Sequence, residues 1–140
     1  MIKSSLRSGF SLMELMIYIA IVGIMLAVVG PNVVNYFSKA KVSTTEQNLK
    51  SLKQAIELYN AHTSQYPETL RDLTRQPMDE RAARKWQGPY VEIKNDELPE
   101  DGWGREFIYR VGEPGSGRPY ELYSLGANGE GSSEAEWIRP

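Results

Sequence analysis

The sequence predicts an α+β protein, in which a long N-terminal helix, membrane-spanning in its first half, packs against a small antiparallel β-sheet. Three observations carry this prediction. Residues 10–29 are almost wholly apolar. Apolar side chains then recur at helical spacing from Val42 to Tyr59. Further on, residues 105–111 and 119–125 alternate in polarity on either side of a Gly/Pro turn, as two paired strands do.

Composition excludes several classes of function. The 140 residues carry 16 basic and 18 acidic side chains, a net charge of −2, and no cysteine. Proteins that bind nucleic acid usually carry an excess of clustered basic residues, which this charge balance does not indicate, so we expect no nucleic-acid partner. Without cysteine, neither disulfides nor thiolate zinc sites can form.

The apolar segment has the length of a membrane span. A helix of residues 10–29 covers roughly 30 Å at about 1.5 Å per residue, the thickness of a bilayer core. A cleaved secretory signal usually has a shorter apolar region and a small-x-small cut site. Here the run ends at Gly30-Pro31 instead. The length of the segment alone is also consistent with a simple uncleaved membrane anchor.

Basic residues flank this segment on both sides. Lys3 and Arg7 precede it, and Lys39 and Lys41 follow it. The two sides carry similar numbers of Lys and Arg residues, so the positive-inside rule gives no strong preference. The short basic head favours a cytoplasmic N-terminus.

Glu14 is the residue that a simple anchor does not explain. A charge at the bilayer centre costs about 2.5–3.5 kcal/mol and calls for a partner. A cut between Gly9 and Phe10 would create an α-amine four residues before Glu14, on the same helical face. The carboxylate would pair with its own amine or with that of a neighbouring subunit. Pairing between subunits would set the register of packed helices, because a mismatch leaves a charge unpaired in hydrocarbon.

The stretch "SGFSLMELM" and the apolar run after it resemble the type IV pilin-like family. In that family a prepilin peptidase cuts after the glycine and methylates the new phenylalanine amine. The resemblance implies that residues 1–9 are a leader peptide and that Gly9 and Phe10 are the processing site. It also implies that Glu14 acts in assembly and that residues 10–30 form the transmembrane helix and filament core.

Four further segments resemble the major pseudopilins of type II secretion systems: "GPNVVNYFSKAK", "AIELYNAHTSQYPETLRDL", "QGPYVE…LPEDGWGREFIYRV" and "YELYSLGANGEG". Many type IV pilins instead close the C-terminal region with a cysteine pair, which is absent here. The sequence departs from the pattern at Gly102, where proline is usual, and at Asn128, where aspartate is usual.

The resemblance implies a type IV pilin-like fold and a subunit that polymerises into a periplasmic pseudopilus, which drives export of folded proteins across the outer membrane. Expected partners are further copies of the chain, minor pseudopilins, the prepilin peptidase and the inner-membrane assembly platform. The expected location is the bacterial inner membrane, with a single pass and a periplasmic globular domain. Two alternatives stay open: a major or minor pilin of a type IV pilus, and a membrane-anchored binding module that does not polymerise.

Gly30 and Pro31 predict a break in the long helix. Proline removes a backbone donor and glycine lowers helix propensity, so we expect a kink or a melted stretch. Residues 31–62 then form the amphipathic second half of the helix, which ends before the "QYP" turn.

Residues 63–140 form a small α/β globular region that ends in a C-terminal loop. A short helix is expected at Thr69–Leu73, and "MDERAARKW" forms a loop or a further helical turn. A short strand is expected at Tyr90–Ile93, which makes the sheet two- or three-stranded.

The sequence contains no signature of an active site. His62 is the lone histidine, and neither a phosphate-binding loop nor a nucleophile–base pair appears. We therefore expect a protein that is not an enzyme.

The C-terminal loop, "SLGANGEGSSEAE" (residues 124–136), concentrates oxygen atoms that suit calcium. Composition alone favours a solvated Gly/Ser loop. The resemblance implies calcium as a possible cofactor, with the Leu125 carbonyl and the Asn128 side chain as ligands by position. A third ligand would come from Glu130, Ser133 or Glu134. Asparagine in place of aspartate at 128 removes one negative charge and should weaken binding.

Overall fold

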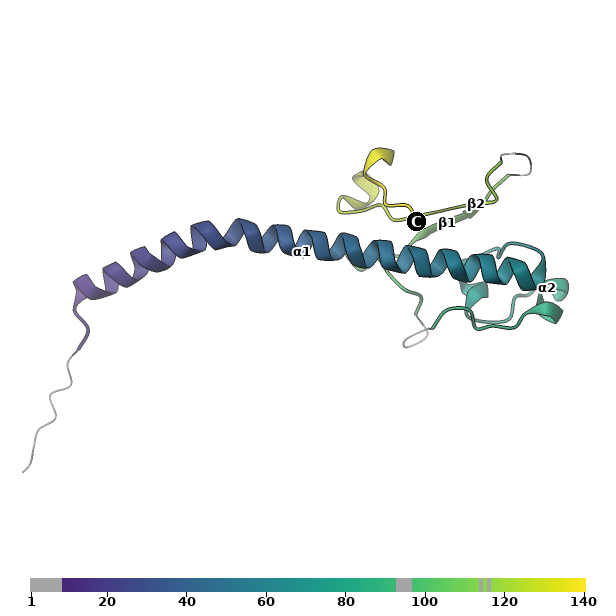
Figure 1. Cartoon of the computed structure of the whole chain (residues 1–140), viewed down its shortest axis with the longest axis horizontal. Coiled ribbons are helices and arrows are strands. Elements are labelled where there is room, and N and C mark those ends of the chain that lie inside the picture. Colours follow the sequence, from purple (N-terminus) through teal and green to yellow (C-terminus); the bar gives the residue numbers. More distant parts are fainter. Residues whose placement is uncertain (1–8, 93–96, 114, 116) are drawn as a thin grey trace, which may run out of the picture. The chain divides into compact units, whose positions relative to one another are not determined.

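The computed structural model describes residues 9–92, 97–113, 115 and 117–140. The chain divides into two compact units, one up to Ser38 and one from Lys39 to Pro140. Helix α1, Leu12–Thr63, runs through both (Figure 1). The first unit therefore has no secondary structure except its part of this helix, within the residues described.

Helix α1 begins with a side-chain cap. The N–H of Met13 donates to Ser11 Oγ at 3.3 Å, which satisfies one of the free donors at the helix start. Glu14 lies in the first turn, where its negative charge is favoured by the helix dipole.

Helix α1 is continuous through Gly30 and Pro31, so the melted stretch predicted there is not present in this structure, while the kink stays a prediction. Proline at 31 removes the single N–H that would bond the carbonyl of Ala27, while the remaining helical bonds stay possible. The Asn32 side chain donates to the carbonyl of Val28 at 3.1 Å and adds a local bond there. The loss of one donor is therefore not enough to end the helix.

The second half of α1 buries one face, as the spacing predicted. Its buried residues are Thr45, Leu49, Leu52, Ala55, Ile56, Tyr59 and Thr63. At the C-terminal end the Thr63 hydroxyl lies within hydrogen-bond distance of two carbonyls, that of Tyr59 at 2.8 Å and that of Gln65 at 3.0 Å. Ser64 then takes a left-handed conformation, with φ of 64°, which turns the chain out of the helix.

Two short helical segments follow. Leu70–Leu73 forms a 3-10 turn, η1, as expected for this region. Helix α2, Glu80–Lys85, resolves the open choice for "MDERAARKW" in favour of a helix. It forms because Asp79 caps it: the Asp79 carboxylate accepts from the N–H of Ala82 at 2.8 Å. This bond lowers the pKa of Asp79.

The sheet is antiparallel and two-stranded in the residues described. Strand β1, Ile108–Val111, pairs with β2, Tyr120–Tyr123, in the register Ile108 to Tyr123 and Val111 to Tyr120. The predicted strand at Tyr90–Ile93 is wrong for Tyr90–Glu92, which have no strand pairing; Ile93 lies outside the described residues. The backbone N–H of Tyr90 instead donates to the carbonyl of Leu73 at 2.7 Å.

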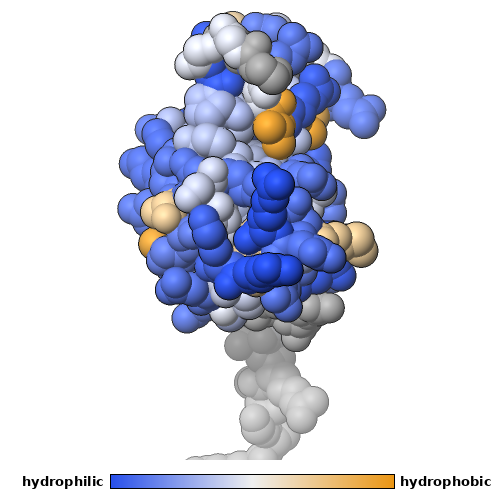
Figure 2. All heavy atoms as spheres, turned by 90° about the vertical axis from the view of Figure 1, so that its right-hand side faces the viewer, coloured by the Kyte–Doolittle hydropathy of each residue, from blue (hydrophilic) through white to orange (hydrophobic). Residues whose placement is uncertain are grey.

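The core of the second unit lies between α1 and the sheet. Leu49, Leu52, Ile56 and Tyr59 of α1 pack with Leu73, Ala82, Val91, Phe107 and Leu122. Aromatic rings surround this cluster, which agrees with the large side chains that a domain of this size needs. The face of this unit shown in Figure 2 is mainly hydrophilic, with scattered hydrophobic residues.

Two 3-10 turns lie in the C-terminal loop: η2, Gly129–Gly131, and η3, Glu134–Glu136. An antiparallel bridge between Ser124 and Ile138 joins the ends of the loop, with N–H···O distances of 2.9 and 3.0 Å. The loop is thus closed at its base and folded on itself.

Candidate functional site: the processing segment and the C-terminal loop

The bond between Gly9 and Phe10 lies in exposed, non-helical backbone just before α1. A Cβ added at Gly9 would have no described atom within 4 Å. Phe10 is 76% exposed, and its ring meets that of Tyr18 edge-on with centroids 6.0 Å apart. A peptidase that binds an extended segment could therefore reach this bond without unwinding the helix.

Glu14 is exposed in the first turn of α1, and no ion pair of this carboxylate is found within the described part of the chain. In the uncut chain the nitrogen of Phe10 belongs to a peptide bond and carries no charge. The amine that the sequence assigns to Glu14 can therefore exist only after cleavage.

The first unit exposes apolar side chains around the whole helix. No Asp, Glu, Lys or Arg occurs between Glu14 and Lys39. The large side chains from Leu12 to Phe37 are largely exposed. Helix α1 contains a window of mean hydropathy 2.6, so it is long and apolar enough to cross a membrane. A helix that is apolar on all sides needs cover from lipid or from other chains.

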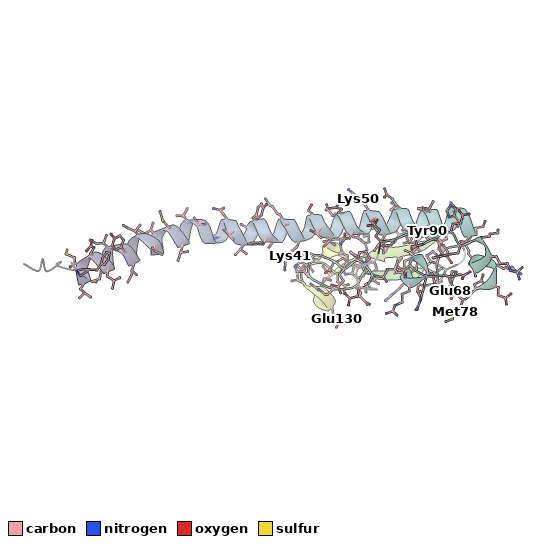
Figure 3. All side chains as sticks on the ribbon, turned by 90° about the horizontal axis from the view of Figure 1, so that it is seen from below. Lys41, Lys50, Glu68, Met78, Tyr90 and Glu130 are labelled. Carbon is pink, nitrogen blue, oxygen red and sulfur yellow. The ribbon has the colours of Figure 1, made fainter. Side chains whose placement is uncertain are left out.

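Of the five candidate calcium ligands, Asn128 and Ser133 are brought to the same carboxylate, but as hydrogen-bond donors. The Asn128 Nδ2 donates to Glu136 Oε1 at 2.6 Å. The N–H and the hydroxyl of Ser133 both donate to Glu136 Oε2, at 2.9 and 3.1 Å. Leu125 is half-buried, and Glu130 lies at the outer edge of the domain, away from α1 (Figure 3).

Sequence reasoning missed two residues that organise this loop. Glu136 lies in the oxygen-rich segment and has no predicted role, yet it accepts all three hydrogen bonds of the network. Arg105 was read as a strand residue, yet its Nη2 donates to the carbonyl of Ala127 at 3.1 Å. The alternation in residues 105–111 shows only the faces of a strand, so no local signal revealed that this side chain reaches the loop.

A buried carboxylate connects the loop to the segment before β1. Asp101 is 6% exposed. Its Oδ1 accepts from the N–H groups of Trp103 and Arg105 at 2.9 and 3.0 Å, and its Oδ2 accepts from Ser124 Oγ at 2.7 Å. The Ser124 Oγ in turn accepts from the N–H of Gly126 at 3.0 Å.

The fold and the processing segment define a class of membrane-anchored, pilin-like subunits. A model of the prokaryotic N-terminal methylation motif matches residues 4–30. The chain belongs to the type II secretion system protein G family, whose model matches residues 32–138. The apolar helix agrees with a membrane anchor, and the family is one of structural secretion-system pilins.

Similar proteins agree with this assignment. The chain is 35% identical over 133 residues to the type II secretion system core protein G of Pseudomonas aeruginosa, covering 91% of this chain and 89% of that protein. It is 36% identical over 123 residues to the core protein G of Xanthomonas campestris pv. campestris, with coverage of 88% and 80%. In fold it resembles the crystal structure of the major pseudopilin of enterohaemorrhagic Escherichia coli, with a TM-score of 0.57, 24% identity, and coverage of 77% and 92%.

Proposed function

We propose that the chain is the major pseudopilin of a type II secretion system. It is made as an inner-membrane precursor, cut between Gly9 and Phe10, methylated on the new amine, and polymerised into a periplasmic filament that drives export of folded proteins. Its role is mechanical rather than enzymatic. The observation that carries the proposal is the uninterrupted apolar surface of α1 in the first unit, which begins directly after the processing site.

The length of this surface supports polymerisation beyond simple anchoring. From Leu12 to Phe37 the helix covers roughly 39 Å, whereas a bilayer core needs about 30 Å. The excess falls at the end that carries Val34, Tyr36 and Phe37, which are exposed by 65%, 72% and 61%. Side chains of this kind outside lipid need protein cover, and neighbouring copies of the same helix in a filament core provide it.

Glu14 gives the packing of these helices its register. Cleavage after Gly9 creates an ammonium on Phe10, and the Glu14 carboxylate of an adjacent copy neutralises it. Any other axial offset leaves two charges unpaired among apolar side chains, which is strongly unfavourable.

Gly30 and Pro31 make the middle of α1 the part that opens when a subunit leaves the bilayer. The carbonyl of Ala27 has no proline N–H to accept from, and Gly30 adds a low helix propensity. Helix α1 is continuous through these residues in the single chain, and the opening is part of the proposed assembly step.

The expected orientation places the second unit in the periplasm and the N-terminus in the cytoplasm, where the prepilin peptidase acts. The short basic head formed by Lys3 and Arg7 favours this arrangement. Minor pseudopilins and the inner-membrane assembly platform are the further partners.

The N-terminal mass of the mature protein tests the proposal. The chain is expressed in a host with an active prepilin peptidase and purified from the membrane. We expect a polypeptide that begins at Phe10 and carries the mass of one added methyl group. An intact Met1 on the mature protein would overturn the proposal in favour of a non-polymerising anchored module.

A further inference from the structure

The C-terminal loop contains an exposed carboxylate, that of Glu136, and satisfies it with its own hydrogen-bond donors. Both carboxylate oxygens of Glu136 accept hydrogen bonds, one from the Asn128 amide and one from the N–H and hydroxyl of Ser133. These bonds, the Ser133 N–H first, hold the pKa of Glu136 below its ordinary value. The network spans the loop, because it joins the residue before η2 to both ends of η3.

A positive charge already lies beside the loop carbonyls. The Arg105 guanidinium donates to Ala127 and packs so closely on Gly129 that a Cβ there would overlap its Nη1. Gly129 also has a φ of +59°, a left-handed conformation that glycine adopts without strain. The left-handed backbone at position 129 and its lack of a side chain both leave room for the Arg105 guanidinium.

Three of the residues that the family resemblance assigns to calcium, Asn128, Ser133 and Glu130, do not fit a cation in this arrangement. Calcium takes six to eight oxygen ligands. Asn128 points its amide nitrogen, a donor, toward Glu136, and the Ser133 hydroxyl is engaged on the same carboxylate. Glu130 is exposed at the outer edge of the domain (Figure 3). In the described part of the chain, no group of three or more His, Cys, Asp or Glu residues could hold a metal ion.

We propose that the hydrogen bonds of Asn128 and Ser133 to Glu136, together with Arg105 on the Ala127 carbonyl, close this loop in place of a cation, so that the subunit folds and keeps its stability without calcium. Asn128 is the residue that makes the difference. An aspartate there would set a second carboxylate against Glu136, across a contact that is now 2.6 Å. Two like charges at this distance repel unless a proton or a cation lies between them.

The test compares thermal unfolding of the full chain in detergent micelles, in millimolar calcium and in EDTA, followed by tryptophan fluorescence. The ring of Trp137 stacks on that of Tyr123 with centroids 4.3 Å apart, so the emission of Trp137 reports on the base of the loop. The native sequence should show the same midpoint in both buffers. Asn128→Asp should unfold at a lower temperature in EDTA and recover in calcium.

Two further variants make the result specific. The double variant Asn128→Asp with Glu136→Gln removes the repulsion and should lose most of the calcium response. Ala127→Asp adds the same charge at a neighbouring exposed position and should show little calcium response.

A calcium-dependent midpoint for the native sequence, or heat on calorimetric titration of it with calcium, would overturn the proposal. So would an Asn128→Asp variant with native stability in EDTA. The titration of the native sequence needs no variant, so it decides the matter even where Asn128→Asp does not fold. The outcome is separate from that of the N-terminal mass, because this inference does not depend on polymerisation.

Discussion

Thr45 and Gly102 join the middle of α1 to the segment before β1. The Thr45 Oγ1 accepts from the N–H of Gly102 at 2.8 Å, while its hydroxyl donates to the carbonyl of Lys41 at 2.8 Å. Thr45 is fully buried, so both bonds are shielded from water. This contact brings the backbone of α1 and the backbone of the segment before β1 close together.

Gly102→Ala should destabilise the second unit by about 2 kcal/mol, a typical cost of overpacking. A Cβ at position 102 would overlap the carbonyl oxygen of Lys41 and lie 2.6 Å from its Cα. Both are backbone atoms of a helix, which cannot move aside as a flexible side chain does. Urea unfolding of the full chain in micelles, followed by tryptophan fluorescence, measures the change.

Gly131→Ala is the matched control for this experiment. A Cβ there has no described atom within 4 Å, and its φ lies outside the left-handed range. Its stability should stay close to that of the native sequence. Equal unfolding curves for both variants would show that α1 and the 102 segment are not in close backbone contact.

Asp101→Ala should cost about 3 kcal/mol or more. The carboxylate accepts three hydrogen bonds while almost fully buried, and its removal leaves the N–H groups of Trp103 and Arg105 and the Ser124 hydroxyl without this acceptor. Each buried donor that loses its partner costs about 1–3 kcal/mol. The loss is measured as a lower urea midpoint at neutral pH.

Glu106→Ala controls for the removal of a carboxylate, because Glu106 is exposed in the same segment. Ser124→Ala removes two hydrogen bonds, the one to Asp101 and the one from the N–H of Gly126. Asp101→Ala removes three, so the loss for Ser124→Ala should be smaller. An Asp101→Ala variant as stable as Glu106→Ala would contradict the role assigned to this junction.

The second unit should unfold in alkaline solution through its tyrosines. Burial raises the pKa of Tyr59 to about 12, and it also raises the pKa of Tyr109 and of Tyr120. The fold prefers the neutral phenols, so their contribution is fully present below the unfolded pKa of about 10. It is lost as the pH rises from about 10 toward the folded values. Tyr59 alone accounts for roughly 2 kcal/mol by pH 12.

Fluorescence-detected unfolding between about pH 9 and pH 12 checks this, with the ionised phenols read by absorbance. Tyr59→Phe should move the alkaline transition to higher pH, because Tyr59 is 1% exposed and its phenolate cannot be hydrated in the fold. Tyr36→Phe, at an exposed position of the first unit, should leave it unchanged. A transition that ignores Tyr59→Phe would rule out this cause.

Periodicity predicted the elements that repeat over several residues. The buried face of α1 and the two paired strands follow from side-chain spacing alone, because a helix and a half-buried strand impose periods of 3.6 and 2. Residues 90–92 lacked such a repeat, and the strand predicted there is not formed. The melted stretch predicted at Pro31 is absent from this structure for a different reason: a propensity penalty is local, and a long helix can tolerate it.

The C-terminal loop shows what pattern reasoning cannot supply. The oxygen-rich composition is the same whether a carboxylate faces a cation or faces the donors of its own loop. The difference depends on the rotamer of Asn128 and on Arg105, which is far from the loop in sequence. Such contacts exist only once the β1 segment and the loop have been brought together.

Glu14→Gln should leave cleavage after Gly9 intact and abolish filament growth. Glutamine keeps the size of the side chain and removes the charge, so the ammonium of a neighbouring Phe10 would stay unpaired among apolar helices, at a cost of about 2.5–3.5 kcal/mol for each subunit. Electron microscopy of assembled filaments and the N-terminal mass of the same sample read the two steps separately. Glu46→Gln, at an exposed position further along α1, should retain both. Normal filaments from Glu14→Gln would mean that the register of the apolar helices comes from packing alone, and the pairing of carboxylate with amine would have to be given up.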